Sequence, residues 1–185
     1  IVVAVVVVVG CSIAAYWMLI SPTTNTNTVQ NSNTVSNANT TQYVDRAVDG
    51  ARVLPGEEQP RLFAVMIENS LDARPLSGLN LASVVYEALA EGGITRYMAI
   101  FPESVDAKEL GPVRSARPYY VSYASAYHPL YIHAGGSPQA LTLLRSANVV
   151  DFNQFTNGKY FWRDTKRYAP HNLYTSGDRL RNVVT

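Results

Sequence analysis

The sequence predicts a mixed α/β domain, of the α+β kind, preceded by one transmembrane helix and a polar linker. Two observations lead to this class. The first 44 residues carry no charge, and all 15 basic and 14 acidic residues lie from Asp45 onward. Beyond that point, short apolar runs typical of buried strands alternate with segments that carry helix-capping residues. We therefore divide the chain into an anchor at 1–20, a linker at 21–42 and a folded domain at 43–185.

Residues 1–20 form an uninterrupted run of apolar and small residues. At about 1.5 Å per residue, a helix of this length spans roughly 30 Å, the hydrocarbon thickness of a bilayer. Tyr16 and Trp17, near the C-terminal end of the run, suit the membrane interface. A buried core strand is the alternative, but core strands usually have only about four to eight residues. The run therefore predicts an uncleaved signal anchor.

Cys11 leaves a second kind of anchor open. Residues 8–11, Val-Val-Gly-Cys, resemble a lipobox, in which cleavage before the cysteine leaves a lipidated N-terminus. A lipidated cysteine normally leads into a polar tether, whereas residues 12–20 continue the apolar run. The pattern favours a spanning anchor, in which Cys11 is a membrane-buried free thiol, over lipidation of Cys11.

The linker at 21–42 is rich in Thr, Asn, Ser and Gln, so it buries too little apolar surface to fold. Treated as a random coil, it has an end-to-end distance of about 25 Å. The first basic residue after the anchor is Arg46, and cytoplasmic flanks are enriched in Lys and Arg. We therefore expect a single-pass protein of the cell membrane whose domain faces the extracytoplasmic side. Residues 1–20 make its contact with the membrane.

The domain at 43–185 is long enough for one hydrophobic core. The formal net charge of the chain is +1, which argues against a nucleic-acid partner, because phosphate binding needs a concentrated basic face. The chain has one cysteine, so no internal disulfide can form.

Apolar runs predict five short strands, at 62–67, 84–89, 94–101, 130–133 and 160–162. Glu91-Gly92-Gly93 separates the second run from the third, a spacing that predicts a hairpin. Pro118 suits the first turn of a helix within 117–127. Ser137, followed by Pro138, and Ser176 are predicted to cap two further helices.

The densest polar group of the sequence surrounds Arg114, Ser115 and Arg117. Two guanidiniums three residues apart share one face of a helical turn, and their planar forks bind carboxylate or phosphate in bidentate fashion. The alternative is that both arginines form structural ion pairs with carboxylates such as Glu87 or Glu91. The sequence favours neither reading.

Two further segments place carboxylates and arginines at strand ends. Glu91 and Arg96 flank the diglycine, where a plain hairpin turn is the simpler explanation. Glu68-Asn69 ends the first strand and is followed by Arg74, and polar groups at this position commonly line a crevice in α/β sheets. Glu68 is expected either to accept a proton or to pair with Arg74.

The three histidines differ in how well their surroundings suit a catalytic role. His128 precedes a proline and is interpreted as a surface turn residue, whereas His133 is interpreted as a hydrogen-bonded core residue. His171 lies in a loop with Asn172, and an imidazole titrates near neutrality, so it is the candidate acid or base. The histidine spacing fits no metal motif and Cys11 lies in the anchor, so we expect no metal and no cofactor.

Four segments resemble one known family in the same order, at 64–101, 111–120 (GPVRSARPYY), 131–141 (YIHAGGSPQAL) and 169–176 (APHNLYTS). The chain is similar to the YerB-like family, membrane-associated bacterial proteins catalogued as a domain of unknown function. The resemblance implies an envelope protein tethered by a signal anchor or lipid, and an N-terminal module that forms a three-layer α/β sandwich around a mixed sheet. Relatives carry a C-terminal module that this chain is expected to lack, as a fragment. The polar residues that carry the resemblance are Glu68, Asn69, Arg74, Glu91, Arg96, Arg114, Arg117, His171 and Asn172.

Three functions remain open. The first is a tethered binding or interaction module whose arginine-lined cleft accepts an anionic group from an envelope ligand or partner protein. Its binding residues are predicted to be Asn69, Arg74, Arg96, Arg114, Ser115, Arg117 and Asn172. The second is an envelope hydrolase or transferase that uses His171 with Glu68 or Glu91 as acid and base. The third is a scaffold whose polar motifs only hold loops together.

Overall fold

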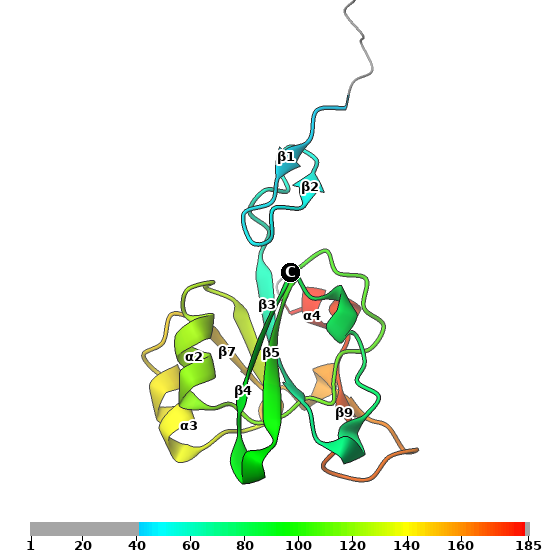
Figure 1. Ribbon diagram of the computed structural model, residues 1–185, viewed down its shortest axis with the longest axis vertical. Helices are drawn as coiled ribbons and strands as arrows, with labels where there is room; N and C mark the ends of the chain where they lie inside the picture. Colours follow the sequence, from blue (N-terminus) through cyan, green and yellow to red (C-terminus); the bar gives the residue numbers. More distant parts are fainter. Residues whose placement is uncertain (1–40, 184–185) are drawn as a thin grey trace, which may run out of the picture. The chain divides into compact units, whose positions relative to one another are not determined.

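The computed structural model describes residues 41–183, which contain a five-stranded mixed sheet in the order β4-β5-β3-β6-β7 (Figure 1). Strand β3 pairs antiparallel with β5 and parallel with β6, β4 pairs antiparallel with β5, and β7 pairs parallel with β6. The strands are β3 (Leu62–Glu68), β4 (Val84–Leu89), β5 (Thr95–Pro102), β6 (Leu130–His133) and β7 (Val150–Asn153). The predicted mixed α/β class and the β4–β5 hairpin are confirmed.

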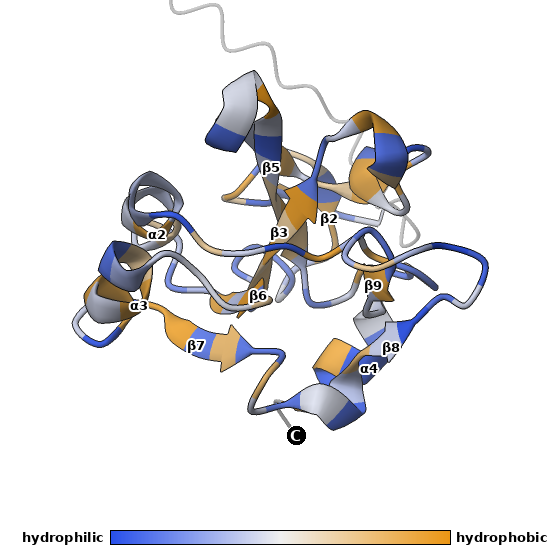
Figure 2. Cartoon of the chain, turned by 90° about the horizontal axis from the view of Figure 1, so that it is seen from below, coloured by the Kyte–Doolittle hydropathy of each residue, from blue (hydrophilic) through white to orange (hydrophobic). Residues whose placement is uncertain are grey.

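A hydrophobic core lies on each face of the sheet because the side chains of β3 alternate between the faces. Phe63, Val65 and Ile67 belong to one cluster, whereas Ala64 and Met66 belong to the other. Figure 2 shows the hydrophobic residues of β3 and β6 in the centre of the domain, with mostly hydrophilic loops around them. A strand buried on both faces reads as a continuous apolar run, which is why the sequence predicts β3 so well.

Different elements cover the two faces (Figure 1). Helices α2 (Pro118–Ala124) and α3 (Pro138–Leu144) pack on the face of Ala64 and Met66. The other face is covered by loops, by helix α4 (Gly177–Arg181) and by a small sheet of β8 (Trp162–Arg163) and β9 (Leu173–Tyr174). The remaining elements are short: strands β1 (Val44–Asp45) and β2 (Arg52–Val53), and the 3₁₀ turns η1 (Leu71–Ala73), η2 (Leu79–Leu81), η3 (Glu91–Gly93) and η4 (Gly158–Tyr160).

The predicted helix starts are confirmed. Pro118 is the first residue of α2. The Ser137 hydroxyl accepts a hydrogen bond from the Ala140 amide at 3.3 Å, and the Ser176 hydroxyl accepts one from the Arg179 amide at 3.2 Å. Each serine satisfies an amide that the first turn of a helix leaves unpaired.

The strand predicted at Tyr160–Trp162 is largely wrong. Tyr160 ends the turn η4, and β8 begins only at Trp162, where it pairs with Tyr174 of β9. Aromatic residues favour strands because their rings pack well on a half-buried pleated surface. Here the Tyr160 ring packs against Phe152 from a turn, so it is partly buried without being part of a strand. Strand β7 was not predicted, because Val-Asp-Phe-Asn has only one buried side chain among its four residues.

Two histidines behave as predicted. His128 is exposed at a positive φ of 49° in the turn before β6. His133 is fully buried, and its ring nitrogens lie 2.7 Å from the Gly135 carbonyl oxygen and 2.7 Å from Asp151 Oδ1.

The predicted anchor at 1–20, Cys11 and nearly all of the predicted linker lie outside the described residues. Within 41–183, no helix has the length and apolar character that a bilayer crossing requires. The transmembrane helix therefore stays a prediction of the sequence.

Candidate functional site

The motif segments meet at one end of the strands of the main sheet. Strands β3 and β6 are parallel, so their last residues, Glu68 and His133, lie at the same end of the sheet, where η3 also joins β4 to β5. The arginine segment passes this end of the sheet between β3 and β6. The Arg114 amide donates to the Met66 carbonyl at 2.9 Å, and the Ala134 amide donates to the Arg114 carbonyl at 3.0 Å. Residues far apart in the sequence are thereby brought within side-chain reach.

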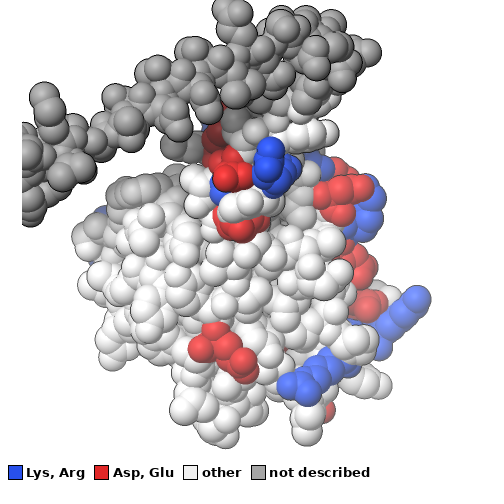
Figure 3. Space-filling model, turned by 45° about the horizontal axis from the view of Figure 1, so that its top comes forward, with Lys and Arg blue, Asp and Glu red and all other residues white. Residues whose placement is uncertain are grey.

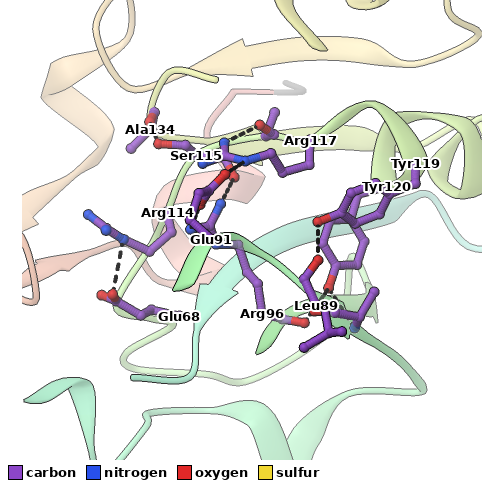
Figure 4. A network of polar contacts seen from close by, with 12 residues as sticks. Glu68, Leu89, Glu91, Arg96, Arg114, Ser115, Arg117, Tyr119, Tyr120 and Ala134 are labelled. Carbon is purple, nitrogen blue, oxygen red and sulfur yellow. Dashed lines mark hydrogen bonds and ion pairs between the residues drawn. The ribbon is translucent and has the colours of Figure 1, made fainter. Parts of the chain in front are cut away.

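Glu91 lies between Arg96 and Arg117, as Figure 4 shows, and these three residues form the Glu91 cluster. Oε1 of Glu91 accepts a short hydrogen bond from Arg117 Nε, and Oε2 lies 3.4 Å from Arg96 Nη2. Arg96 is buried and also donates from Nη1 to the Ser115 carbonyl at 2.8 Å. The Ser115 hydroxyl donates to the Ala134 carbonyl at 2.9 Å. The cluster ties the hairpin turn to the arginine segment.

Both guanidiniums of the Glu91 cluster share the single carboxylate of Glu91. The hydrogen bond from Arg117 lowers the pKa of Glu91 to about 2, against a smaller opposing effect of desolvation. Burial lowers the pKa of Arg96, and the neighbouring Arg117 lowers it further. A carboxyl group with so low a pKa stays ionised near neutral pH, which argues against Glu91 as a proton donor. Of the two ion-pair partners proposed for Arg117, the structure selects Glu91.

Two tyrosines of α2 fix the strand ends beside this cluster (Figure 4). The Tyr120 hydroxyl accepts a hydrogen bond from the Ala88 amide at 2.9 Å and donates a short one to the Arg96 carbonyl. The Tyr119 hydroxyl donates to the Leu89 carbonyl at 2.6 Å. Burial raises the pKa of Tyr120 to about 12, so its hydroxyl remains a donor.

Glu68 is the centre of a second group, the Glu68 cluster. Its Oε1 lies 3.2 Å from Arg114 Nε, and its Oε2 lies 2.9 Å from His171 Nδ1. The Ser70 hydroxyl lies 3.3 Å from the same histidine nitrogen. The Arg114 contact is an ion pair without hydrogen-bond alignment. Within residues 41–183, the terminal nitrogens of Arg114 and Nε2 of His171 have no hydrogen-bond partner.

The predicted pairing of Glu68 with Arg74 is wrong. Arg74 Nη2 donates instead to Asn69 Oδ1 at 2.8 Å. The Asn69 amide nitrogen in turn donates to Thr95 Oγ1 at 2.7 Å and to Glu87 Oε1 at 3.3 Å. Arg114 takes the carboxylate because its segment runs directly beside the end of β3. The side chain of Asn69 is occupied by protein groups.

Asn172 has a structural task in the loop between β8 and β9. It is buried, and its Oδ1 accepts from Arg163 Nη1 at 2.7 Å. Its Nδ2 donates to the carbonyl oxygens of Asp164 and Arg167, both at 3.1 Å. These bonds hold the loop closed and place His171 against Glu68.

A cavity of about 450 Å³ opens beside His171, between the η1 loop and the β8–β9 loop. It is lined by Asp72, Arg74, Lys166, Arg167, Tyr168 and His171. Arg167 joins the two loops, since its Nη1 donates to the Ala73 carbonyl at 2.6 Å and its Nη2 donates to the Pro75 carbonyl at 2.8 Å. Among the described residues, Arg74, Lys166 and Arg167 form no ion pair. Three cations and one carboxylate, Asp72, therefore line the cavity, and none of the three cations forms an ion pair within the described residues.

Of the predicted site residues, Arg74 and His171 line this cavity, whereas Ser70, Lys166, Arg167 and Tyr168 were not among the predicted residues. The sequence signal for these missed residues was the pair of adjacent basic residues, Lys166 and Arg167, in a short polar loop upstream of His171. Arg96, Ser115 and Arg117 lie in the Glu91 cluster, and no contact joins that cluster to His171 within the described part of the chain. The predicted polar residues thus divide between the Glu91 cluster, the Glu68 cluster and two separate hydrogen-bond networks around Asn69 and Asn172.

The other surfaces of the described domain offer less. A larger hollow of about 590 Å³ lies beside β1 and the end of α2, but none of the motif residues line it. The face seen in Figure 3 is largely uncharged, and most of its basic side chains lie close to acidic ones. Residues 41–183 contain no group of three His, Cys, Asp or Glu side chains placed to hold a metal. The cavity at His171 is a concave site on which polar side chains converge, and two of the motif residues, Arg74 and His171, line it.

Comparison with known proteins decides the family. Residues 50–185 match the family described as "Protein of unknown function (DUF3048) N-terminal domain". The chain belongs to the DUF3048 family. It is 43% identical over 129 residues to the "Putative lipoprotein YerB" of Bacillus subtilis (strain 168), a match that covers 67% of this chain and 38% of that protein. The predicted resemblance to YerB-like proteins is confirmed.

A solved DUF3048 structure supports the fold. The crystal structure of the YerB protein from Bacillus subtilis superposes with a TM-score of 0.71 at 38% sequence identity. The match covers 76% of this chain and 49% of that one. The chain therefore spans about half the length of the solved relative and less of the curated one. The comparisons name a family without an assigned activity, so function has to be argued from the two clusters and the cavity.

Proposed function

We propose that this chain is a membrane-tethered, extracytoplasmic module of the bacterial cell envelope that binds an anionic group in the cavity at His171. The single observation that carries the proposal is the set of three unpaired cations, Arg74, Lys166 and Arg167, around one concave site. The location rests on the apolar residues 1–20 and on the similarity to a protein named as a lipoprotein.

Three of the arginines predicted to line the cleft are less suited to bind an anion. Arg96 and Arg117 are committed to Glu91, and Arg114 is paired with Glu68. A cation already bonded to a carboxylate has little charge to offer a ligand, whereas an unpaired guanidinium or ammonium attracts an anion strongly. Arg74, Lys166 and the ring of His171 are therefore the proposed binding groups, and Arg167 adds positive charge while its hydrogen bonds hold the two loops together.

Calorimetric titration of the protein with inorganic phosphate and with glycerol 3-phosphate tests this function. A charge-assisted hydrogen bond contributes about 1.5–3 kcal/mol, so Lys166→Ala and Arg74→Ala should each weaken binding by roughly 10- to 100-fold. Arg145→Ala is the matched control, because Arg145 is exposed on the C-terminal side of α3 and lines no part of the cavity. Equal affinity in all three variants, or absence of binding to both anions, contradicts the proposal.

An acid–base function is the second candidate, and one contact favours it. Oε2 of Glu68 lies 2.9 Å from Nδ1 of His171, and a carboxylate at this nitrogen favours the tautomer that carries its proton on Nδ1 and leaves a lone pair on Nε2. This is the orientation of a general base that activates water. Ser70 contacts the same nitrogen as Glu68, whereas a serine–histidine–carboxylate triad needs opposite nitrogens. The candidate is therefore a hydrolase or transferase without a serine nucleophile.

Hydrolysis of p-nitrophenyl phosphate and p-nitrophenyl acetate tests the second candidate. Turnover should disappear in His171→Ala and fall in Glu68→Gln, while Arg145→Ala retains it. Turnover that survives His171→Ala with a folded protein excludes this role. A protein that binds phosphate but shows no turnover of either ester supports the binding module alone.

A further inference from the structure

The two loops that bound the cationic cavity each carry one exposed apolar side chain, Leu71 and Tyr168. Tyr168 is 90% exposed and Leu71 is 81% exposed, the highest values among the large hydrophobic residues of the described chain. Tyr168 lines the cavity, and Leu71 precedes Asp72, which also lines it. In Figure 1 the η1 turn and the loop between β8 and β9 lie at the same end of the molecule. The cationic site therefore has an apolar rim on both of its loops.

Hydrogen bonds of residues that line the cavity hold the two loops of the rim in place. Arg167 bonds to two carbonyl oxygens of the η1 loop, and the His171 amide donates to the Tyr168 carbonyl at 2.9 Å. Both loops are therefore braced next to Leu71 and Tyr168. A rim that is preorganised in this way loses little conformational entropy when it is covered.

A basic site with exposed apolar side chains around it is better suited to bind a membrane surface than to bind a soluble anion. Full burial of a side chain such as leucine contributes about 1.5–3 kcal/mol. Each Lys or Arg near an anionic leaflet contributes about 1 kcal/mol. Tyrosine prefers the interfacial zone, where its ring is buried and its hydroxyl stays in water. A free phosphate ion would use the three cations and leave Leu71 and Tyr168 in water.

We infer that the ligand of this cavity is the phosphate headgroup of an anionic membrane lipid, and that Leu71 and Tyr168 enter the bilayer interface around it. The inference rests on the proposed anion binding and specifies its source. Arg74 and Lys166 contact the headgroup, Arg167 holds the loops, and the two apolar tips add affinity that a soluble ion cannot gain.

The position of the cavity is compatible with a tethered chain. Strands β1 and β2 lie at the opposite end of the domain from the η1 turn (Figure 1). Residues 21–41 have a maximum extended length of about 70 Å. A domain of this size is roughly 40 Å across. The covalent limit therefore allows the cavity end to face a membrane in which residues 1–20 are anchored.

Hydrogen–deuterium exchange of the whole protein in lipid nanodiscs tests the inference. One set of discs contains only phosphatidylcholine, and the other contains phosphatidylglycerol and phosphatidylcholine in equal amounts. Peptides covering 71–75 and 164–171 should exchange at least about 5-fold more slowly in the anionic discs. Because every disc carries the same anchor segment, the difference reports on the cavity.

Variants separate the two parts of the site. Leu71→Ser combined with Tyr168→Ser should remove most of the protection in anionic discs, and Leu71→Ser alone, which changes no residue that lines the cavity, should leave the affinity for glycerol 3-phosphate unchanged. Lys166→Ala should weaken both. Phe155→Ser is the matched control, because Phe155 is 74% exposed but does not line the cavity, and it should change neither.

The outcomes distinguish this inference from the function beneath it. Binding of glycerol 3-phosphate without lipid-dependent protection overturns the lipid inference and leaves the anion site standing. Protection that is equal in both discs, or unaffected by the Leu71 and Tyr168 substitutions, also overturns it. If neither anion nor anionic disc has an effect, the proposed function fails as well.

Discussion

Replacement of Glu68 by glutamine should destabilise the domain by about 2 kcal/mol. The carboxylate is 7% exposed and lies 3.2 Å from Arg114 and 2.9 Å from His171. At an effective dielectric of 20, unit charges at this distance attract by about 5 kcal/mol, much of which offsets desolvation of the carboxylate. Removing one partner of a buried pair costs about 3–5 kcal/mol. Because the Arg114 side chain is 24% exposed and can hydrate, we expect a loss below this range, of about 2 kcal/mol.

Urea unfolding of the protein measures this loss, with Glu87→Gln as the control. Glu87 is exposed and accepts hydrogen bonds from the uncharged side chains of Asn69 and Thr95, so its substitution should change the free energy of unfolding by less than about 0.5 kcal/mol. The double variant Glu68→Gln with Arg114→Met should be more stable than additivity predicts, by about 1 kcal/mol or more, because it leaves no unpaired buried charge. Additive effects, or a Glu68 variant as stable as the parent, would refute the ion-pair reasoning.

Three further predictions concern stability and use the same unfolding assay. Glu91 has its pKa lowered to about 2, so its contribution is present above its ordinary pKa of 4.5 and is lost as pH falls from about 4.5 to about 2. In Glu91→Gln the free energy of unfolding should no longer fall over this pH range by the contribution of Glu91, which is at most about 1 kcal/mol for so exposed a pair. The same pH dependence in the variant and the parent would contradict this. Tyr120→Phe should cost about 1–3 kcal/mol, because two backbone groups lose a partner, whereas Tyr123→Phe should cost less than about 0.5; equal effects would argue against the Tyr120 contacts. Gly177→Ala would place a Cβ 2.3 Å from a carbonyl oxygen and should cost about 2 kcal/mol or more, whereas Gly158→Ala meets no atom within 4 Å, and a tolerated Gly177→Ala would contradict the close packing.

The sequence predicted what local patterns encode. Strand β3 is apolar on both faces, and the serine caps at Ser137 and Ser176 are read from a few adjacent residues. Four of the five predicted strands appear at nearly their predicted positions, because each is a continuous apolar run bounded by turn residues. Strand β7 and the small β8–β9 sheet escaped, since two to four residues with mixed polarity carry too little pattern.

The sequence could not predict which charges pair. The choice of Arg114 rather than Arg74 as the partner of Glu68 depends on the segment 111–117 running along the end of β3, which is a property of the tertiary fold. The cavity depends on Arg167 bonding to carbonyl oxygens more than 90 residues earlier in the chain. Periodicity and capping signals extend over a few residues, so contacts of this kind leave no trace in them.

The two kinds of cation in this domain have opposite energetic consequences. Arg96, Arg114 and Arg117 are matched by carboxylates, so removing a partner exposes an uncompensated charge and lowers stability. Lys166 lines one cavity with Arg74, Arg167 and a single carboxylate, Asp72, and forms no ion pair within the described residues, so its removal relieves repulsion and has little structural cost. A bound anion supplies the missing partner and stabilises the folded state by about 2.7 kcal/mol at 100 times its Kd. Charge that is unnecessary for folding but concentrated around a cavity is therefore the part of this structure that a ligand can use.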